Sequence, residues 1–276
     1  MNRAVTDLRQ EPSRYSEQVS QALLGETLRI LEIKGDWARV RTVREGYLAW
    51  ARLAALQQVT PAEARGYLAD CQARVLAELL PASHTAKLLP GDYAGKLPFG
   101  VNVRVEAEDG EAALVRLPDG RGWWVRRSGL LPLEDCPKPD PQGIAFTLDL
   151  MRRFTGTPYL WGGRSPFGFD CSGFAGAFWG FMGVTLPRDA DQQFRQGIPV
   201  EGPPEPGDLI YFGEPDPDQP NARYASIDHV AISLGGDEVL HATSSAGGVV
   251  INSLDPDSPT YRAWLRETLT GVRRFV

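Results

Sequence analysis

The chain has 276 residues, of which 42% are hydrophobic and 23% are charged, and its formal net charge is −6. This length allows two or three small domains with modest cores, and the composition is that of an ordinary globular protein. The negative charge argues against nucleic acid or an anionic membrane surface as the main partner and suits a small cationic or zwitterionic ligand. No apolar run reaches about eighteen residues, so we expect no membrane span.

The first eighteen residues contain no hydrophobic segment after their basic residues, so they are unlike a secretory signal peptide. The three cysteines, Cys71, Cys136 and Cys171, stand at irregular spacing, which does not indicate a disulfide framework. Both features favour a cytoplasmic protein. A secreted or periplasmic location stays open if a leader has been removed.

Residues 1–60 show short alternating strands that predict a first small β-barrel. Apolar residues alternate over 24–33, 37–42 and 47–50, and turn residues such as Gly35 and Gly46 separate these segments at hairpin spacing.

The same pattern returns in residues 61–135, after a segment at 61–80 that we interpret as a short helix or connector. Gly25 aligns with Gly100, and Trp50 with Trp124. We therefore expect two copies of one β-module ahead of the rest of the chain.

The two copies differ at positions that bear on chemistry. The first copy has Glu26 where the second has Val101, and it has Tyr47 approximately where the second has Arg121. Exposed acids and phenols on a β-module are usually solvated surface, and that interpretation stays open here.

A proline-rich connector over 131–143 marks the next boundary, and we expect a third domain over 143–276. Apolar periodicity predicts its first helix over 144–154. A turn at 203–208 leads into a strand at 209–212, a polar loop over 214–226 follows, and a last strand is expected at 271–276.

A glycine-rich stretch delivers Cys171 to the start of an apolar segment, 174–182, that we expect to be a buried helix. The positive end of a helix makes a thiol lose its proton more easily, and its unpaired N–H groups can bind an oxyanion. Cys171 is therefore a candidate nucleophile. The alternative is a small core residue.

A nucleophilic cysteine needs a base, and the base needs an orienting partner. His229 and His241 lie in one predicted hairpin, and alternation along its strands puts both on the same face. One histidine can then orient the other. Either alone would more simply be structural.

A zinc site made from these histidines with Cys171 and Asp170 is a rival interpretation, but no CxxC or HxxxH spacing supports it, so we expect no metal or cofactor.

Several motifs occur in a fixed order over 143–276: LWGGRSPFGF, DCSGF, LPRDADQQF, PGDLIYF, DHVAI and VLHATSSAGGV. In that order they resemble the NlpC-type papain-like cysteine peptidases that cut cell-wall peptides. Ser233 departs from the family pattern, which often has an aromatic residue there. The resemblance implies an α+β papain-like catalytic domain.

The resemblance also implies roles for individual residues. Cys171 would be the nucleophile, His229 the general base and His241 the third, polar member of a triad. Tyr159 would help bind the oxyanion, while Asp170 and Ser172 would line the substrate pocket. It further suggests a structural role for Arg188.

The two β-modules resemble bacterial SH3-like domains, and with the motifs QALLGE and GYLAW the whole chain resembles the γ-D-glutamyl-L-diamino-acid endopeptidases of cell-wall peptide recycling. That resemblance implies that Glu26 and Tyr47 hold the free amino terminus of the substrate. We therefore expect two small all-β SH3-like barrels followed by the catalytic domain, and an endopeptidase acting on L-Ala-γ-D-Glu-diamino-acid peptides. The alternatives are a non-catalytic wall-binding protein, or an amidase or acyltransferase with the same fold.

Overall fold

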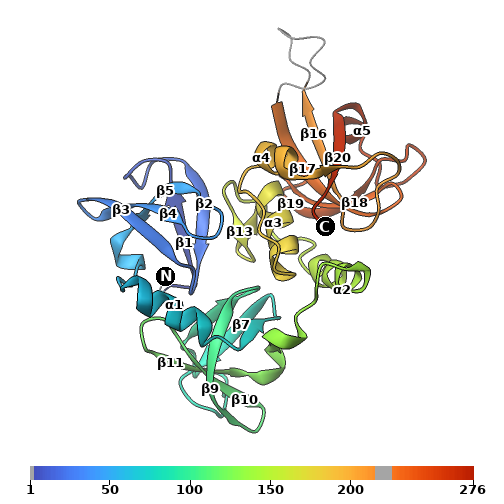
Figure 1. The fold of residues 1–276 in the computed structure, drawn as a ribbon. Coiled ribbons are helices and arrows are strands. Elements are labelled where there is room, and N and C mark those ends of the chain that lie inside the picture. Colours follow the sequence, from blue (N-terminus) through green and yellow to red (C-terminus); the bar gives the residue numbers. More distant parts are fainter. Residues whose placement is uncertain (1–2, 215–225) are drawn as a thin grey trace. The chain divides into compact units, whose positions relative to one another are not determined.

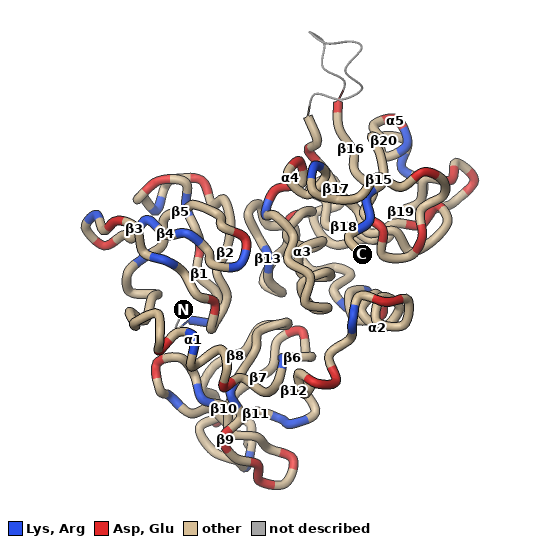
Figure 2. The backbone as a smooth tube through the Cα atoms, viewed as in Figure 1, with Lys and Arg blue, Asp and Glu red and all other residues tan. Residues whose placement is uncertain are grey.

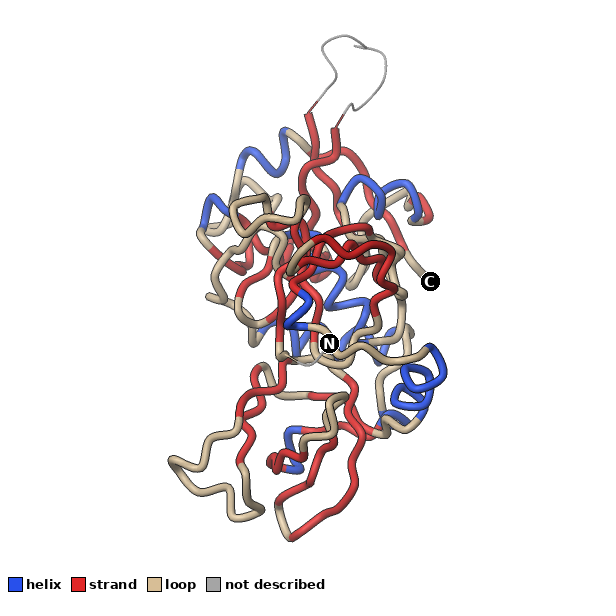
Figure 3. Tube along the Cα trace, turned by 90° about the vertical axis from the view of Figure 1, so that its left-hand side faces the viewer, coloured by secondary structure: helices blue, strands red, loops and turns tan. Residues whose placement is uncertain are grey.

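A computed structural model describes residues 3–214 and 226–276, which form two compact units, Met1–Cys136 and Pro137–Val276 (Figure 1). Most of the predicted polar loop before His229 falls on 215–225, outside the described residues. Strands dominate the first unit, whereas the second combines strands with helices. Figure 3 colours the helices and strands along the whole trace. Over the described ranges, no helix is both long and apolar enough to cross a bilayer.

The first unit begins with an antiparallel sheet of order β2-β1-β5-β4-β3. Its strands are β1 Val5–Arg9, β2 Gln18–Leu23, β3 Leu28–Lys34, β4 Trp37–Thr42 and β5 Leu48–Arg52, and the short 3-10 helix η1 Leu53–Ala55 follows. Alternate residues of β4 and β5, among them Val40 and Ala51, are fully buried in its core. The three predicted strands are present, whereas β1 and β2 were not predicted.

The helix α1, Pro61–Ala69, connects this sheet to a second one. Thr60 and Glu63 cap its start reciprocally, and Pro61 occupies the first turn. The helical interpretation of 61–80 is correct only for this first half, because the remainder contains two strands of the next sheet.

The second sheet of the first unit has the order β12-β6-β9-β10-β11-β7-β8. Its strands are β6 Ala73–Val75, β7 Leu79–Ser83, β8 Gly95–Pro98, β9 Asn102–Asp109, β10 Ala112–Arg116, β11 Gly122–Arg126 and β12 Leu130–Pro132, with 3-10 helices η2 Arg127–Gly129 and η3 Leu133–Asp135. Leu23 and Leu24 pack into the core of this second sheet, so the two β-modules share apolar contacts within one unit.

The backbone shows the internal repeat directly. Gly25 and Gly100 both have φ of 79°, in the left-handed region where glycine is favoured. Trp50 and Trp124 lie on β5 and β11, each the strand that runs into a 3-10 helix. The residues aligned by sequence thus occupy equivalent places in the two modules.

The second unit contains a six-stranded antiparallel sheet of order β15-β20-β16-β17-β18-β19 and a small two-stranded sheet. The strands are β13 Arg164–Ser165, β14 Gly168–Phe169, β15 Ile198–Pro199, β16 Leu209–Glu214, β17 Ser226–Gly235, β18 Glu238–Thr243, β19 Gly248–Ser253 and β20 Leu269–Arg274. The helices are α2 Pro141–Arg152, α3 Cys171–Phe181, α4 Ala190–Gln196 and α5 Ala263–Glu267, with a 3-10 helix η4 Ser244–Ala246.

Two predicted boundaries in this unit are corrected. Helix α2 starts at Pro141 rather than 144, because the Asp140 side chain accepts a hydrogen bond from the Gly143 N–H and caps the helix there. The last strand runs over 269–274, not 271–276, since β20 pairs with β16 from Leu269 onward.

Helix α3 confirms the predicted buried helix. It contains no charged residue and is tan along its length in Figure 2. It contacts β17 and β18, the two strands that hold the histidines. Large apolar side chains, including Phe174 and Phe178, are almost completely buried. The interior of the second unit therefore fixes the start of α3 against the histidine hairpin.

Candidate active site

Asp170 begins α3 as its N-cap and places Cys171 at the first helical position. The Asp170 carboxylate accepts hydrogen bonds from the Gly173 N–H at 2.7 Å and from the Gly162 N–H at 2.9 Å. One side chain thus caps the helix and ties it to the glycine-rich loop before it. The N–H groups of the first turn have no partner within the helix, as an oxyanion site requires.

The close approach of this loop to α3 depends on glycine. A Cβ built on Gly173 would lie 2.1 Å from the Gly163 carbonyl oxygen, which no side chain can tolerate without a backbone shift. The glycines around Cys171 therefore let two backbone segments touch at the start of the helix.

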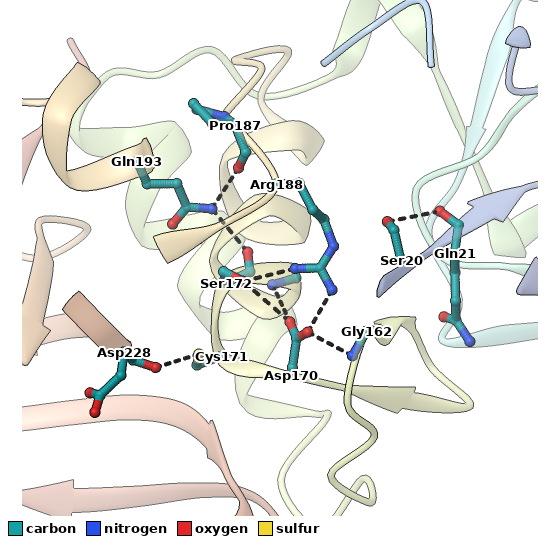
Figure 4. A network of polar contacts seen from close by, with 11 residues as sticks. Ser20, Gln21, Gly162, Asp170, Cys171, Ser172, Pro187, Arg188, Gln193 and Asp228 are labelled. Atoms are coloured by element: carbon teal, nitrogen blue, oxygen red, sulfur yellow. Dashed lines mark hydrogen bonds and ion pairs between the residues drawn. The ribbon is translucent and has the colours of Figure 1, made fainter. Parts of the chain in front are cut away.

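Cys171 lies against the part of β17 that carries His229. Its sulfur is 3.9 Å from the Asp228 carbonyl oxygen (Figure 4), and it also interacts with the Val230 backbone N–H. Asp228 and Val230 are the two residues that flank His229. Cys171 is 9% exposed as a whole residue, so its thiol is almost completely buried.

The two histidines are joined directly, as predicted. His229 Nε2 and His241 Nδ1 are 2.7 Å apart. In the β17–β18 register Ile232 pairs with Leu240, so His241 lies one diagonal step from His229 on the same face. Since Nε2 of His229 is engaged, Nδ1 is the ring nitrogen left for a thiol.

The chain of contacts continues to Asn252. His241 Nε2 lies 3.0 Å from Asn252 Oδ1, and Asn252 is on β19, the strand next to β18. The Trp264 ring packs against both histidines, with centroids 5.3 Å from His229 and 6.2 Å from His241. The histidine pair is therefore held by hydrogen bonds along its length and by an aromatic ring on its side.

Burial controls the protonation of these histidines. It lowers the pKa of His229 well below 6.5, with a further lowering by His241. The pKa of His241 is lowered to about 4, chiefly by burial; the hydrogen bond to Asn252 acts to raise it and the charge of Arg262 to lower it. Both rings are neutral at neutral pH, which is the state of a general base ready to accept a proton.

Burial first and the Asp170 charge second raise the pKa of the Cys171 thiol, which is about 12. Interactions with the backbone and with Arg188 lower it by less. The backbone donors at the helix start favour the thiolate, as expected, but burial outweighs them. In the free protein, the thiol needs a base to take its proton.

Asp170 and Ser172 are brought together with Arg188 in a buried network (Figure 4). Arg188 donates to Asp170 Oδ2 at 2.5 Å and to Ser172 Oγ at 2.8 Å. The Gln193 amide donates to the Ser172 carbonyl oxygen at 3.1 Å and so ties α4 to the start of α3. The negative charge of Asp170 is thus balanced within the unit.

Tyr159 lies close enough to this centre for its ionisation to be affected by Cys171 and Asp170. Burial raises the pKa of its hydroxyl first, and those two charges raise it further. Its backbone N–H donates to the Gly247 carbonyl oxygen at 2.9 Å, which fixes the loop before β13. The hydroxyl stays protonated, as a hydrogen-bond donor to an oxyanion must.

Glu26 and Tyr47 belong to the first unit. They precede β3 and β5, and both of these strands start where β4 ends, so the sheet order places the two residues at the same end of the sheet. Glu26 accepts a hydrogen bond from the Leu23 N–H at 2.9 Å and lines a cleft of about 390 Å³ with Tyr67 and Asp119. Tyr47 is partly buried against the core of its module.

Asn252 and Trp264 also contact the histidine pair, although neither was predicted from the sequence to be part of this site. Asn252 could have been found from the alternation of β19, because it lies two residues from Val250, the partner of His241. Trp264 carried no signal, since its position depends on the fold of α5. Within residues 3–214 and 226–276, no cluster of three or more His, Cys, Asp or Glu could hold a metal ion.

Comparison with known proteins agrees with this geometry. Residues 156–268 match the model of the NlpC/P60 family, and residues 8–56 match the bacterial dipeptidyl-peptidase Sh3 domain. The chain is 30% identical over 271 residues to the γ-D-glutamyl-L-lysine dipeptidyl-peptidase of Bacillus cereus, covering 93% of this chain and 75% of that protein. It is 28% identical to dipeptidyl-peptidase 6 of Lysinibacillus sphaericus, covering 97% of this chain and 96% of that protein.

The fold has a counterpart among solved structures. The crystal structure of an NlpC/P60 family protein from Bacillus cereus superposes with a TM-score of 0.82 at 24% identity, over 100% of this chain and 98% of that one. These similarities confirm the predicted fold class of SH3-like β-modules followed by a papain-like catalytic domain. With a cysteine at a helix start beside a histidine pair, the chain belongs to the NlpC/P60 family of cysteine peptidases.

Proposed function

We propose that this protein is a cysteine dipeptidyl-peptidase that cuts the γ-D-glutamyl-diamino-acid bond of cell-wall peptides with a free N-terminal L-alanine. The observation that carries the proposal is the placement of the Cys171 sulfur against the backbone on both sides of His229, whose ring is held from behind by His241. A thiol and a neutral imidazole in this arrangement suit acyl transfer.

In the proposed mechanism, the Cys171 sulfur attacks the carbonyl carbon of the γ-glutamyl bond while His229 Nδ1 takes the thiol proton. A C–S bond forms, and the carbonyl oxygen becomes an oxyanion. His229 then returns the proton to the leaving amine as the C–N bond breaks. Water, deprotonated by the same ring, hydrolyses the thioester and restores the thiol.

The oxyanion would be bound by the Cys171 backbone N–H and the Tyr159 hydroxyl. The backbone N–H always carries its proton, and the raised pKa of Tyr159 keeps its hydroxyl protonated, so both groups can donate a hydrogen bond. Such prearranged donors typically contribute about 10²–10³ in kcat each. Tyr159→Phe tests this role, since it removes the donor and keeps the ring.

The substrate class rests on similarity. A relative named γ-D-glutamyl-L-lysine dipeptidyl-peptidase aligns over 93% of this chain, first module included. Release of a dipeptide requires recognition of a free amine. Because the Asp170 side chain is 9% exposed and its charge is balanced by Arg188, we assign the substrate amine to Glu26 and Tyr47 in the module that matches a dipeptidyl-peptidase Sh3 domain.

The test is mass spectrometry of products from L-Ala-γ-D-Glu-L-Lys, its N-acetylated form and its α-linked isomer, with native protein and with Cys171→Ala. We expect native protein alone to release L-Ala-γ-D-Glu, and only from the free, γ-linked peptide. Glu26→Gln should raise KM for the free peptide and leave the catalytic unit intact.

The possible outcomes separate the parts of the proposal. Equal cleavage of the acetylated peptide would disprove amine recognition and keep the peptidase. Cleavage of the α-linked isomer would disprove γ-glutamyl specificity. No cleavage of any peptide would disprove the dipeptidyl-peptidase activity and shift weight to an acyltransferase or a binding protein.

A further inference from the structure

Asn252 holds the far end of the histidine pair through both of its amide atoms. Its Oδ1 lies 3.0 Å from His241 Nε2, and its Nδ2 donates to the Thr260 carbonyl oxygen at 3.1 Å. The side chain is 5% exposed, so water does not replace either contact freely. The Thr260 carbonyl also accepts from the Ser253 N–H at 3.1 Å, which fixes that carbonyl in place.

The two contacts leave one orientation for the amide. A carbonyl oxygen can only accept, so the NH₂ group must face Thr260 and the amide oxygen must face His241. A flipped amide would set two oxygens against each other at Thr260. The amide oxygen in turn accepts only from a protonated nitrogen, so His241 carries its proton on Nε2.

The same logic passes along the histidine pair. With its proton on Nε2, neutral His241 presents a lone pair at Nδ1, and the 2.7 Å contact then requires the proton on His229 Nε2. His229 Nδ1 is left with a lone pair, and the Cys171 sulfur lies against the backbone of Asp228 and Val230 on either side of this histidine. We infer that Asn252 is a positioning residue that sets the tautomers of both histidines, and so makes His229 Nδ1 the base.

The inference rests on the proposed function for its catalytic consequence, but its structural part needs no substrate. The first test is nitrogen NMR of ¹⁵N-histidine-labelled native protein at neutral pH. The chain has three histidines, and the third, His84, is exposed in the first unit and provides a reference. We expect His229 and His241 both to carry the proton on Nε2. A proton on Nδ1 of either ring in native protein would overturn the inference.

The second test compares Asn252→Ala with Ser253→Ala, a neighbour whose side chain lies on the opposite face of the sheet. Removing Asn252 frees His241 to place its proton on Nδ1, which turns His229 Nδ1 into a donor that cannot accept the thiol proton. We expect a mixture of tautomers in the spectrum of Asn252→Ala and a loss in kcat of about 10- to 100-fold, as for other residues that orient a catalytic group, with KM unchanged. Ser253→Ala should keep native tautomers and kcat.

These readouts distinguish the inference from the proposed function. Native tautomers in Asn252→Ala with full kcat would overturn the inference and leave the peptidase standing. Failure of native protein to cut any peptide would count against the function only, since the spectrum of native protein would still decide the tautomers.

Discussion

The buried ion pair between Asp170 and Arg188 gives the sharpest stability prediction. Both side chains are less than a tenth exposed, at 9% and 5%, and the Nη2–Oδ2 distance is 2.5 Å. Arg188→Met keeps most of the apolar volume and removes the guanidinium. The Asp170 carboxylate would then be buried without a compensating charge.

Breaking a buried ion pair from one side costs about 3–5 kcal/mol. Two backbone N–H groups, from Gly162 and Gly173, would still stabilise the carboxylate, so we expect the low end, about 3 kcal/mol. In the Arg188→Met background, the further change Asp170→Asn should lower the free energy of unfolding by less than it does in native protein. The double variant has no unpaired buried charge, whereas Asp170→Asn alone leaves Arg188 unpaired.

The assay is urea unfolding followed by hydrogen exchange mass spectrometry, which separates peptides of the two units. Peptides from α3 and β17 of Arg188→Met should lose protection at lower urea, while those from β9 and β10 should be unchanged. Arg195→Met is the matched control, since Arg195 forms an exposed pair with Asp191 at 2.6 Å. Such pairs contribute about 0.3–0.5 kcal/mol. Equal shifts for the two variants would refute the reasoning.

Three further predictions concern the catalytic unit. Cys171→Ala should abolish peptide cleavage while hydrogen exchange stays native. Because burial lowers the pKa of His229 well below 6.5, its ring stays neutral as pH falls through that value, so kcat/KM should show no acid limb near pH 6.5; a limb there would contradict this. Gly173→Ala should reduce both stability and kcat, since its Cβ would meet a backbone carbonyl at 2.1 Å, whereas Gly176→Ala in the same helix has open space and should be neutral or stabilising by about 0.5–1 kcal/mol.

The start of α3 and the joined histidine pair of the candidate site were predictable because local signals agree there. The glycines, the N-cap Asp170 and the apolar run after Cys171 each predict the same helix start. Alternation along the hairpin predicted that His229 and His241 share one face of the sheet, because side chains of paired strands point to the two faces in turn. These are short-range patterns, so they depend little on the rest of the fold.

The strands that were not predicted from the sequence depend on long-range pairing. β1 has only two apolar residues, of which Leu8 is fully buried, and in β2 polar residues such as Gln21 are buried beside Ala22, so neither strand shows a clean alternation. β6 and β7 lie in a segment rich in Ala, Leu and Glu, whose helix propensity is high. β6 pairs with β9 and β7 with β11, and these tertiary contacts outweigh local preference.

The protonation state of Cys171 shows why a motif does not determine chemistry by itself. The same Asp170 that caps α3 raises the pKa of the thiol beside it, and burial raises it more. Burial also keeps His229 neutral. Because the thiol and the imidazole are both neutral in the free protein, they do not form a thiolate–imidazolium ion pair before substrate binds. The thiol proton is therefore transferred to His229 during attack on the substrate. The fixed tautomer of His229 then matters more than its charge, because only a lone pair on Nδ1 can accept that proton.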